Sequence, residues 1–280
     1  MRYVTFTHGG RLRPGRLEGD RVSAIACESL IEYIALPGEQ RASRHLSESY
    51  ALTEVSLAAP VRPHKNIFCV GRNYMEHAKE GARAAGRDLK LPDVPTFFTK
   101  APTAIADPDQ TLEFSSAVSS EYDWEAELAI VLGARVKDIP IERALDAVFG
   151  YMCFNDITAR DLQRAHVQWF KGKSLDDAAP MGPWIVSAGE IGDAQHLDIA
   201  LRLNGQEKQH SNTSNMIFPL ARIIAELSKG MTLEPGDVIA TGTPEGVGFA
   251  RTPPEFFKDG DTVEVEIEKI GILRNRIRII

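Results

Sequence analysis

The sequence predicts an α+β fold in which β-strands predominate. Segments typical of strands outnumber those typical of helices, and the two kinds of segment seldom alternate regularly. Residues 261–279 alternate polar and apolar side chains with the period of two that a strand has. Regular β–α–β alternation would instead indicate a doubly wound parallel sheet, so a mainly β architecture is favoured.

The composition is typical of a folded globular protein. The chain has 280 residues, 43% of them apolar, which suits one large or two modest domains that need no disulfides. The 22 glycines and 16 prolines are dispersed without a period, which excludes collagen-like structure and disorder. The net charge of -7 argues against a surface for nucleic acid or for an anionic membrane, since both need a basic patch.

Apolar runs and cysteines indicate the compartment. No run approaches the ~18 consecutive apolar residues of a membrane-spanning helix, and the longest candidate covers residues 128–134. Residues 1–15 lack the apolar stretch of a secretory signal. Cys27, Cys69 and Cys153 lie far apart without a CxxC pair, so we expect them to be reduced. These features predict a cytoplasmic protein.

Residues 1–60 are expected to form a small N-terminal domain. Residues 1–26 contain two short strand-like runs around glycine-rich turns, which predicts a hairpin or meander. A helical segment over residues 29–38 ends at a Pro-Gly pair. Two prolines within residues 58–66 mark the boundary, so residues 61–280 are expected to form the larger domain.

The larger domain is predicted to begin with a buried strand over residues 66–71 and a helix or lid over residues 73–86. Further strands are predicted at 96–100, 121–132 and 151–158, near 183–187, 198–204 and 237–241, and over 261–279. Helices are predicted over residues 140–150, 159–167 and 218–230.

Four acidic side chains alternate with apolar ones in the strand predicted at 121–132. Because side chains alternate between the two faces of a strand, the four are expected to share one face. They are Glu121, Asp123, Glu125 and Glu127. Neighbours on that face lie ~7 Å apart, where two carboxylates repel by roughly 2 kcal/mol at an effective dielectric of about 20. The strand continues into apolar residues, so positive charge is expected beside Glu125 and Glu127.

A hard divalent cation such as Mg²⁺ would supply this charge, because it prefers carboxylate oxygens and tolerates bound water. Asp156, in the next predicted strand, could provide a third oxygen ligand. Two simpler interpretations remain open from the residues alone. The acidic strand could be a solvated edge strand with lysines nearby, and Asp156 could be the N-cap of the helix that follows it.

His77 and Glu80 are three residues apart and would lie on one face of the helix predicted at 73–86. A carboxylate beside an imidazole orients the ring and raises its basicity, as a general base requires. A surface ion pair in a lid would have the same spacing, so both interpretations remain.

Two glycine-containing segments are candidate anion sites. Residues 172–174 (GKS) match the end of a P-loop, but Val167 stands where that motif needs glycine, which rejects this interpretation. Lys173 remains a cation near acids. Residues 241–248 (TGTPEGVG) either place backbone N–H groups around an anion or form a tight connection between strands. The sequence has no HExxH, GxSxG, GxGxxG or CxxC motif.

Five segments, in this order, together resemble the fumarylacetoacetate hydrolase family. They are residues 66–80 (NIFCVGRNYMEHAKE), 121–133 (EYDWEAELAIVLG), 150–163 (GYMCFNDITARDLQ), 168–184 (QWFKGKSLDDAAPMGPW) and 236–248 (GDVIATGTPEGVG). The likeness covers nearly all of residues 61–280, and residues 1–60 resemble the small domain of many bacterial members. It implies a mixed β-sandwich or roll, usually in a homodimer.

The resemblance also implies the residues of the site. A Mg²⁺ or Mn²⁺ ion would be held by Glu125, Glu127 and Asp156, which match the acidic motif of the family, while Asp123 lies outside the ligand set. His77 and Glu80 match the family's water-activating pair, and Gln163 and Lys173 match residues that orient the substrate and stabilise an oxyanion. Thr243 matches a residue that binds the substrate carboxylate. Arg72, Tyr74 and Lys100 lie in matching segments near the pocket.

The implied reaction is hydrolysis of a carbon–carbon bond in a small-molecule 2-oxo acid with a second carbonyl, such as an acylpyruvate. His77 would activate water, the metal would stabilise the enolate that leaves, and residues 78–90 would close over the site. Decarboxylation of oxaloacetate, isomerisation of a muconate-type oxo acid, hydration of a dienoate and a non-catalytic binding protein are the alternatives. The His77–Glu80 pair is expected to favour hydrolysis over simple tautomerisation.

Overall fold

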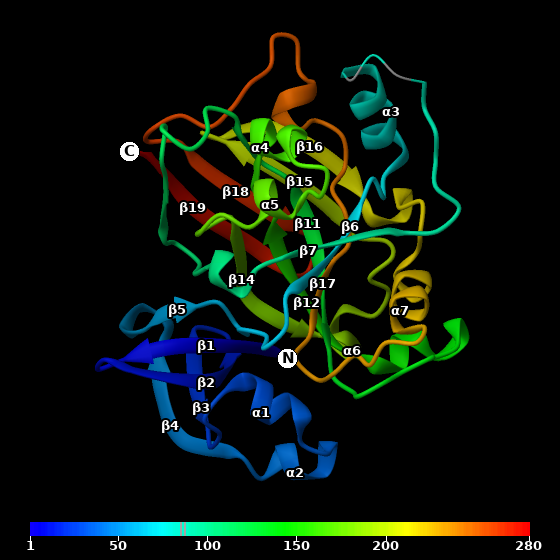
Figure 1. The fold of residues 1–280 in the computed structure, drawn as a ribbon. Helices are drawn as coiled ribbons and strands as arrows, with labels where there is room; N and C mark the ends of the chain where they lie inside the picture. Colours follow the sequence, from blue (N-terminus) through cyan, green and yellow to red (C-terminus); the bar gives the residue numbers. More distant parts are fainter. Residues whose placement is uncertain (85, 87) are drawn as a thin grey trace.

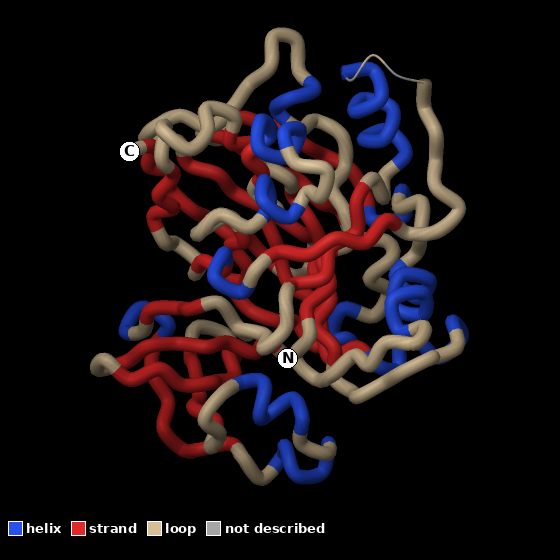
Figure 2. Tube along the Cα trace, in the orientation of Figure 1, coloured by secondary structure: helices blue, strands red, loops and turns tan. Residues whose placement is uncertain are grey.

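The computed structural model describes residues 1–84, 86 and 88–280, and it shows packed β-sheets with a smaller lobe at the N-terminal end (Figure 1). Strands form most of the regular structure (Figure 2), so the predicted α+β, mainly β class is confirmed. The predicted helix at 73–86 and lid at 78–90 include residues 85 and 87, which lie outside the described residues. None of the described helices is long and apolar enough to cross a membrane.

The larger sheet has 12 strands among the described residues. They are β1 (Arg2–His8), β2 (Arg11–Glu18), β3 (Arg21–Ile25), β4 (His45–Ala51), β5 (Ser56–Ala58), β6 (Ile67–Gly71), β7 (Thr96–Lys100), β8 (Ile105–Ala106), β11 (Ala126–Leu132), β12 (Val148–Asn155), β14 (Ala179–Ser187) and β17 (Val238–Ala240). The main order is β4-β3-β2-β1-β14-β12-β11-β17-β6-β7, with β5 on β1 and β8 on β14. Parallel pairs β17–β6 and β14–β8 make the sheet mixed.

A second sheet packs on the first. Its strands are β9 (Thr111–Phe114), β15 (Asp198–Leu203), β16 (Gln206–Asn212), β18 (Thr262–Ile267) and β19 (Gly271–Ile279), in the order β16-β15-β18-β19-β9. Buried side chains alternate with partly exposed ones along β18, as the period of two predicted. β11 and β12 contact β15 and β18, and apolar side chains such as Leu128, Leu201 and Val265 fill the space between the sheets. The mixed sandwich implied by the family resemblance is therefore present.

Short helices connect the strands. They are α1 (Leu30–Ala35), α2 (Gly38–Ala42), α3 (Met75–Ala84), α4 (Arg160–Ala165), α5 (Phe170–Lys173), α6 (Ala188–Ile191), α7 (Leu220–Ser228) and the 3₁₀ helices η1 (Leu52–Glu54), η2 (Pro102–Ala104), η3 (Ile141–Ala147), η4 (Thr213–Asn215) and η5 (Gly248–Ala250). The helix predicted over 140–150 is wrong in type and length. It is the 3₁₀ helix η3, and residues 148–150 belong to β12 because they pair with β11 and β14.

The N-terminal residues extend the larger sheet. β1 pairs with β14 through Arg2–Val186 and Tyr3–Ile185, and β2, β3 and β4 follow outward. The side chain of Ser29 caps α1 by accepting a hydrogen bond from the N–H of Glu32. α1 contacts β1 and β2, and its buried side chains belong to one apolar cluster with residues of β12 and β14. A division into domains at residue 60 stays a prediction.

Gly150 lies in β12 where a side chain has no room. A Cβ added there would lie 2.3 Å from the carbonyl oxygen of Val186 in β14. We expect Gly150→Ala to lower the free energy of unfolding by about 1–3 kcal/mol, because the two strands must move apart. Gly189→Ala in α6 is the matched control, since an added Cβ there meets no atom of the described residues within 4 Å. Urea unfolding measures both, and equal stability of the two variants would contradict this packing.

Candidate active site

The acidic segment at 121–127 is interrupted, so the prediction of one continuous strand is wrong. β10 (Tyr122–Asp123) pairs with β13 (Thr158–Ala159), whereas β11 pairs with β12 and β17. Trp124 and Glu125 lie between the two strands. The Asp123 carboxylate accepts a hydrogen bond from the N–H of Trp124, a local contact of the kind that competes with strand pairing.

The interruption separates Asp123 from the other acidic side chains. Glu121, Glu125 and Glu127 line one cavity, whereas Asp123 is fully buried outside its lining. Glu121 pairs there with Arg164, at 2.7 Å between Oε2 and Nη2. The expectation that four carboxylates share one face therefore holds for three of them.

Glu125, Glu127 and Asp156 lie together. One carboxylate oxygen from each lies within 4.8 Å of the others, and all three side chains are buried. The N–H of Asp156 donates to the Glu125 carbonyl at 2.9 Å, which sets the two residues side by side. β11 runs between β12 and β17, so the edge-strand interpretation is wrong. The N-cap interpretation of Asp156 is also wrong, because the residue preceding α4 is Ala159.

Two lysines and an arginine contact these carboxylates. Lys173 Nζ donates to Glu125 Oε2 and to Asp156 Oδ2, both at 2.8 Å. Lys100 Nζ donates to Asp156 Oδ1 at 2.6 Å, and Arg160 Nη2 lies 2.7 Å from Glu125 Oε1. Burial raises the pKa of Glu125, but Lys173 and Arg160 outweigh burial and lower it to about 2. Glu125 is therefore ionised at neutral pH.

Glu127 makes no salt bridge in the described part of the chain. Its Oε2 accepts a hydrogen bond from the N–H of Gly242 at 2.8 Å. Burial raises the pKa of Glu127 well above its ordinary value, and repulsion from Asp156 and Glu125 raises it further. Counted as fully ionised, and with Asp123 included, the four buried carboxylates outnumber the three buried cations by one. Converging carboxylate oxygens with excess negative charge fit a hard divalent cation.

The GKS segment places Lys173 by packing rather than by binding phosphate. Lys173 is the last residue of α5, which follows α4 closely. A Cβ on Gly172 would lie 2.5 Å from the backbone nitrogen of Gln163 in α4, so only glycine permits this approach. The ammonium has three N–H bonds, two of which are directed at carboxylates, and the third is available to an oxygen in the cavity.

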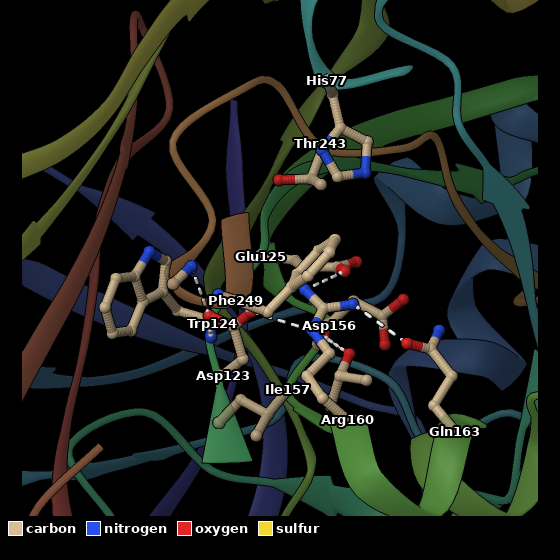
Figure 3. Close-up of polar contacts among 12 residues, drawn as sticks. His77, Asp123, Trp124, Glu125, Asp156, Ile157, Arg160, Gln163, Thr243 and Phe249 are labelled. Carbon is tan, nitrogen blue, oxygen red and sulfur yellow. Dashed lines mark hydrogen bonds and ion pairs between the residues drawn. The ribbon is translucent and has the colours of Figure 1, made fainter. Parts of the chain in front are cut away.

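α3 carries the pair that the spacing predicted. His77 Nδ1 and Glu80 Oε1 are 2.9 Å apart, with side chains 11% and 16% exposed, so the surface-ion-pair interpretation does not hold. Glu80 Oε2 accepts a hydrogen bond from the N–H of Gly246 at 3.0 Å. An ionised Glu80 accepts from Nδ1–H, which leaves Nε2 of the ring as the acceptor. Figure 3 shows His77 and Thr243 together on one side of the acidic cluster.

Residues 241–248 surround anions with backbone N–H groups, and these anions are the protein's own carboxylates. Gly242 donates to Glu127, Gly246 to Glu80 and Gly248 to Asp123. Gly246 has a φ of 98°, and a Cβ there would lie 2.1 Å from the Lys208 carbonyl oxygen. One segment therefore positions carboxylates from three elements, α3, β10 and β11.

A cavity of about 950 Å³ joins these groups. The site residues expected from the sequence that line it are Arg72, His77, Glu125, Glu127, Gln163, Lys173 and Thr243. Described residues of the expected lid, including Ala78, Gly81 and Lys90, also line it. Arg72, at the end of β6, is exposed and lies 5.4 Å from the Trp169 ring centroid. Thr243 Oγ1 accepts a hydrogen bond from Gln209 Nε2 at 2.8 Å.

The remaining expected residues lie behind the cavity wall. Glu80 contacts His77, and Lys100 and Asp156 form a fully buried pair that Lys173 also contacts through Asp156. Tyr74 is fully buried, and its hydroxyl has no hydrogen-bond partner in the described structure. Roles in binding substrate for Lys100 and Tyr74 stay predictions.

Arg160 and Gln209 were not singled out from the sequence. Arg160 contacts Glu125, Asp123 and Gln163. Arg160 lies four residues after Asp156 in the sequence, and this position could have indicated its role, because a cation is expected close to several buried acids. Gln209 lies in β16, a strand that the sequence did not predict. Its side-chain amide donates a hydrogen bond to Thr243 and accepts one from the N–H of Ala126. No local motif indicates this residue.

The fold and the acidic site define a family. Residues 66–278 match the family model for the fumarylacetoacetate (FAA) hydrolase C-terminal domain, which covers most of the chain. The protein belongs to the fumarylacetoacetate hydrolase family and is an enzyme of that family.

Known relatives differ in the reactions that their names give. Oxaloacetate tautomerase YisK of Bacillus subtilis (strain 168) is 44% identical over 261 residues, which are 93% of this chain and 84% of that protein. The solved fumarylacetoacetate hydrolase EaFAH from Exiguobacterium antarcticum is 38% identical, with a TM-score of 0.86 and coverage of 100% of both chains. The 2-hydroxyhepta-2,4-diene-1,7-dioate isomerase from Mycobacterium marinum is 33% identical, with a TM-score of 0.82 and coverage of 100% and 98%.

Proposed function

We propose that the enzyme interconverts the keto and enol forms of a 2-oxo dicarboxylate of the oxaloacetate type. The observation that carries this proposal is the buried, hydrogen-bonded His77–Glu80 pair, which shares one cavity with Glu125, Glu127 and Lys173. Such a pair can move a proton to or from the carbon next to a keto group. The similarity to a relative named oxaloacetate tautomerase supports this choice of reaction.

Glu125, Glu127 and Asp156 would hold the divalent cation that the reaction requires. Their all-carboxylate ligand set suits Mg²⁺ or Mn²⁺ better than a softer metal. When bound, the ion would polarise the keto oxygen and neutralise the charge that develops on it. The homodimer and the cytoplasmic location remain predictions.

The protein's own groups provide the rest of the chemistry. Glu80 holds the Nδ1–H of His77, so Nε2 can take a proton from the substrate carbon and pass it to the oxygen that becomes the enol hydroxyl, and the reverse transfer restores the keto form. Lys173 can donate its third N–H to the substrate oxygen. Gln163 accepts from Arg160 through its carbonyl, which leaves its NH₂ group for a substrate oxygen. Thr243, beside His77 in Figure 3, is positioned by Gln209 to meet the substrate carboxylate.

Hydrolysis of an acylpyruvate is the second candidate. The same His77–Glu80 pair can take a proton from water instead of from carbon, so the pair does not by itself favour hydrolysis. A solved relative that is titled a fumarylacetoacetate hydrolase supports this candidate. Tautomerisation consumes no water and breaks no carbon–carbon bond, which separates the two reactions by experiment.

The test is a panel of oxaloacetate and acylpyruvates assayed with Mg²⁺ or Mn²⁺. Ketonisation is followed by the loss of enol absorbance, exchange at C3 by deuterium incorporation, and cleavage or decarboxylation by the products released. We expect catalysed exchange and ketonisation of oxaloacetate that EDTA abolishes and Mg²⁺ restores. Cleavage of acylpyruvates without any acceleration of oxaloacetate ketonisation would establish the hydrolase instead.

A further inference from the structure

Asp123 lies beside the site, and hydrogen-bond donors occupy all the acceptor positions of its carboxylate. It is fully buried, and its Oδ1 accepts hydrogen bonds from the N–H of Trp124 at 2.8 Å and of Gly248 at 2.7 Å. Its Oδ2 accepts from Arg160 Nε at 2.8 Å and from the N–H of Phe249 at 3.0 Å. A carboxylate offers about four acceptor sites, so none is left for a substrate or a metal ion. Any effect of Asp123 on the reaction must act through the groups that it holds.

The guanidinium of Arg160 contacts a carboxylate with one edge and an aromatic ring with one face. Asp123 binds its Nε, and the Phe249 ring centroid lies 4.4 Å from its central carbon (Figure 3). The other nitrogens reach the cavity wall, where Nη2 lies 2.7 Å from Glu125 Oε1 and Nη1 donates to Gln163 Oε1 at 3.2 Å. Because a guanidinium is rigid and planar, the contact with Asp123 sets the direction of these two groups.

The same carboxylate fixes η5 against the helix that carries the proton-transfer pair. Two consecutive N–H groups of η5, from Gly248 and Phe249, end on Asp123. η5 packs against α3, where a Cβ on Gly81 would lie 3.9 Å from the Phe249 ring. The position of α3 relative to the acidic cluster therefore depends on a turn that Asp123 anchors.

We propose that Asp123 is a positioning residue, which orients Arg160 toward Glu125 and Gln163 and holds Phe249 against α3. The effect on turnover rests on the function proposed above, whereas the arrangement itself does not. Removal of the Asp123 charge would release the guanidinium edge and let η5 and α3 shift together. A displacement of about 1 Å in such a constellation costs turnover on the order of 100-fold.

A double-mutant cycle tests whether Asp123 acts through Arg160. Asp123→Asn keeps the size of the side chain but turns its NH₂ group toward the N–H donors of Arg160 and Phe249. We expect Asp123→Asn and Arg160→Gln each to lower kcat about 10- to 100-fold with a smaller change in KM. The double variant should be slower than Arg160→Gln alone by clearly less than the full factor of Asp123→Asn, because only the part of the effect that acts through η5 is still to be lost. Losses that multiply in the double variant would overturn the proposal.

Asp107→Asn is the matched control. Asp107 also accepts from an arginine, Arg62 at 2.6 Å, and from a backbone N–H, that of Ala59 at 2.8 Å, but it lies outside the cavity lining. Its kcat should stay within about 2-fold of wild type, as for a surface pair. Loss of activity in Asp107→Asn equal to that in Asp123→Asn would mean that general destabilisation explains both, which also overturns the proposal.

Crystal structures of the wild-type protein and of Asp123→Asn provide a readout that needs no substrate. We expect Arg160 to leave Gln163 and η5 to move in the variant, and unchanged positions would overturn the proposal. A wild-type enzyme that turns over none of the oxo acids would contradict the proposed function alone.

Discussion

His77→Ala is expected to lower turnover by about 10²- to 10⁴-fold, the usual contribution of a positioned general acid–base group. Its imidazole lines the cavity, and Glu80 orients it from behind at 2.9 Å. The substitution removes no oxygen atom from Glu125, Glu127 or Asp156, so the affinity for Mg²⁺ should stay within a few-fold of wild type. Steady-state kinetics with oxaloacetate, together with titration calorimetry for Mg²⁺, measure the two quantities.

His196→Ala is the matched control for this change. His196 makes the same contact with a carboxylate three residues away, at 2.6 Å between its Nδ1 and Asp193 Oδ2, but it is 66% exposed and outside the cavity lining. It should turn over substrate at the wild-type rate. Glu80→Gln should be slower than wild type but faster than His77→Ala, because it only disturbs the orientation of the ring. Normal turnover in His77→Ala would exclude this imidazole as the proton carrier.

Glu127→Gln is expected to abolish divalent-cation binding and yet to stabilise the metal-free protein. Glu127 is buried and makes no salt bridge with any residue that the structure describes, and burial raises its pKa well above the ordinary value. An amide keeps the oxygen that accepts from Gly242 and removes a carboxyl group whose charged form is disfavoured by burial and by the neighbouring carboxylates. In EDTA the free energy of unfolding should rise by about 1–2 kcal/mol. Mg²⁺ at a hundredfold excess over Kd should add about 2.7 kcal/mol to the wild type and nothing to the variant.

Glu125→Gln should have the opposite effect on the metal-free protein. Its carboxylate compensates Lys173 and Arg160, so the substitution leaves both cations with too little negative charge in a buried site. We expect a loss of about 3 kcal/mol or more, since removal of one partner from a buried pair is costly. Thermal unfolding in EDTA and in Mg²⁺ compares the two variants. Stabilisation by Mg²⁺ that persists in Glu127→Gln would disprove the assignment of this ligand.

The parts of the site that follow from short-range patterns could be predicted from the sequence. His77 and Glu80 contact each other because residues three apart share a face of a helix. Glu125 and Glu127 line one cavity because alternate residues of an extended segment point the same way. The segment at 241–248 was open between two interpretations, and both features occur, since it connects strands and also surrounds carboxylates with N–H groups.

Contacts between distant segments could not be predicted in this way. Lys100, at the end of β7, pairs with Asp156, and Lys173 reaches both Asp156 and Glu125. Nothing in the neighbouring residues marks these lysines as buried, because burial depends on which strands and helices pack over them. The interruption at Trp124 could not be predicted either. β10 pairs with β13 instead of with the strands of the larger sheet, and the alternation of polar and apolar residues does not indicate which strand a segment pairs with.

By itself, the sequence determined the strand-rich class, the spacing of the acidic and histidine side chains, and the likeness to one enzyme family. The tertiary structure alone decided which charges are compensated. Among the described residues, Glu127 has no salt bridge, whereas hydrogen-bond donors occupy both oxygens of Asp123, although the two residues are close in sequence and equally acidic. The reason is that local periodicity sets the direction of a side chain, whereas the charge around it depends on residues that only the packing of the whole chain brings near.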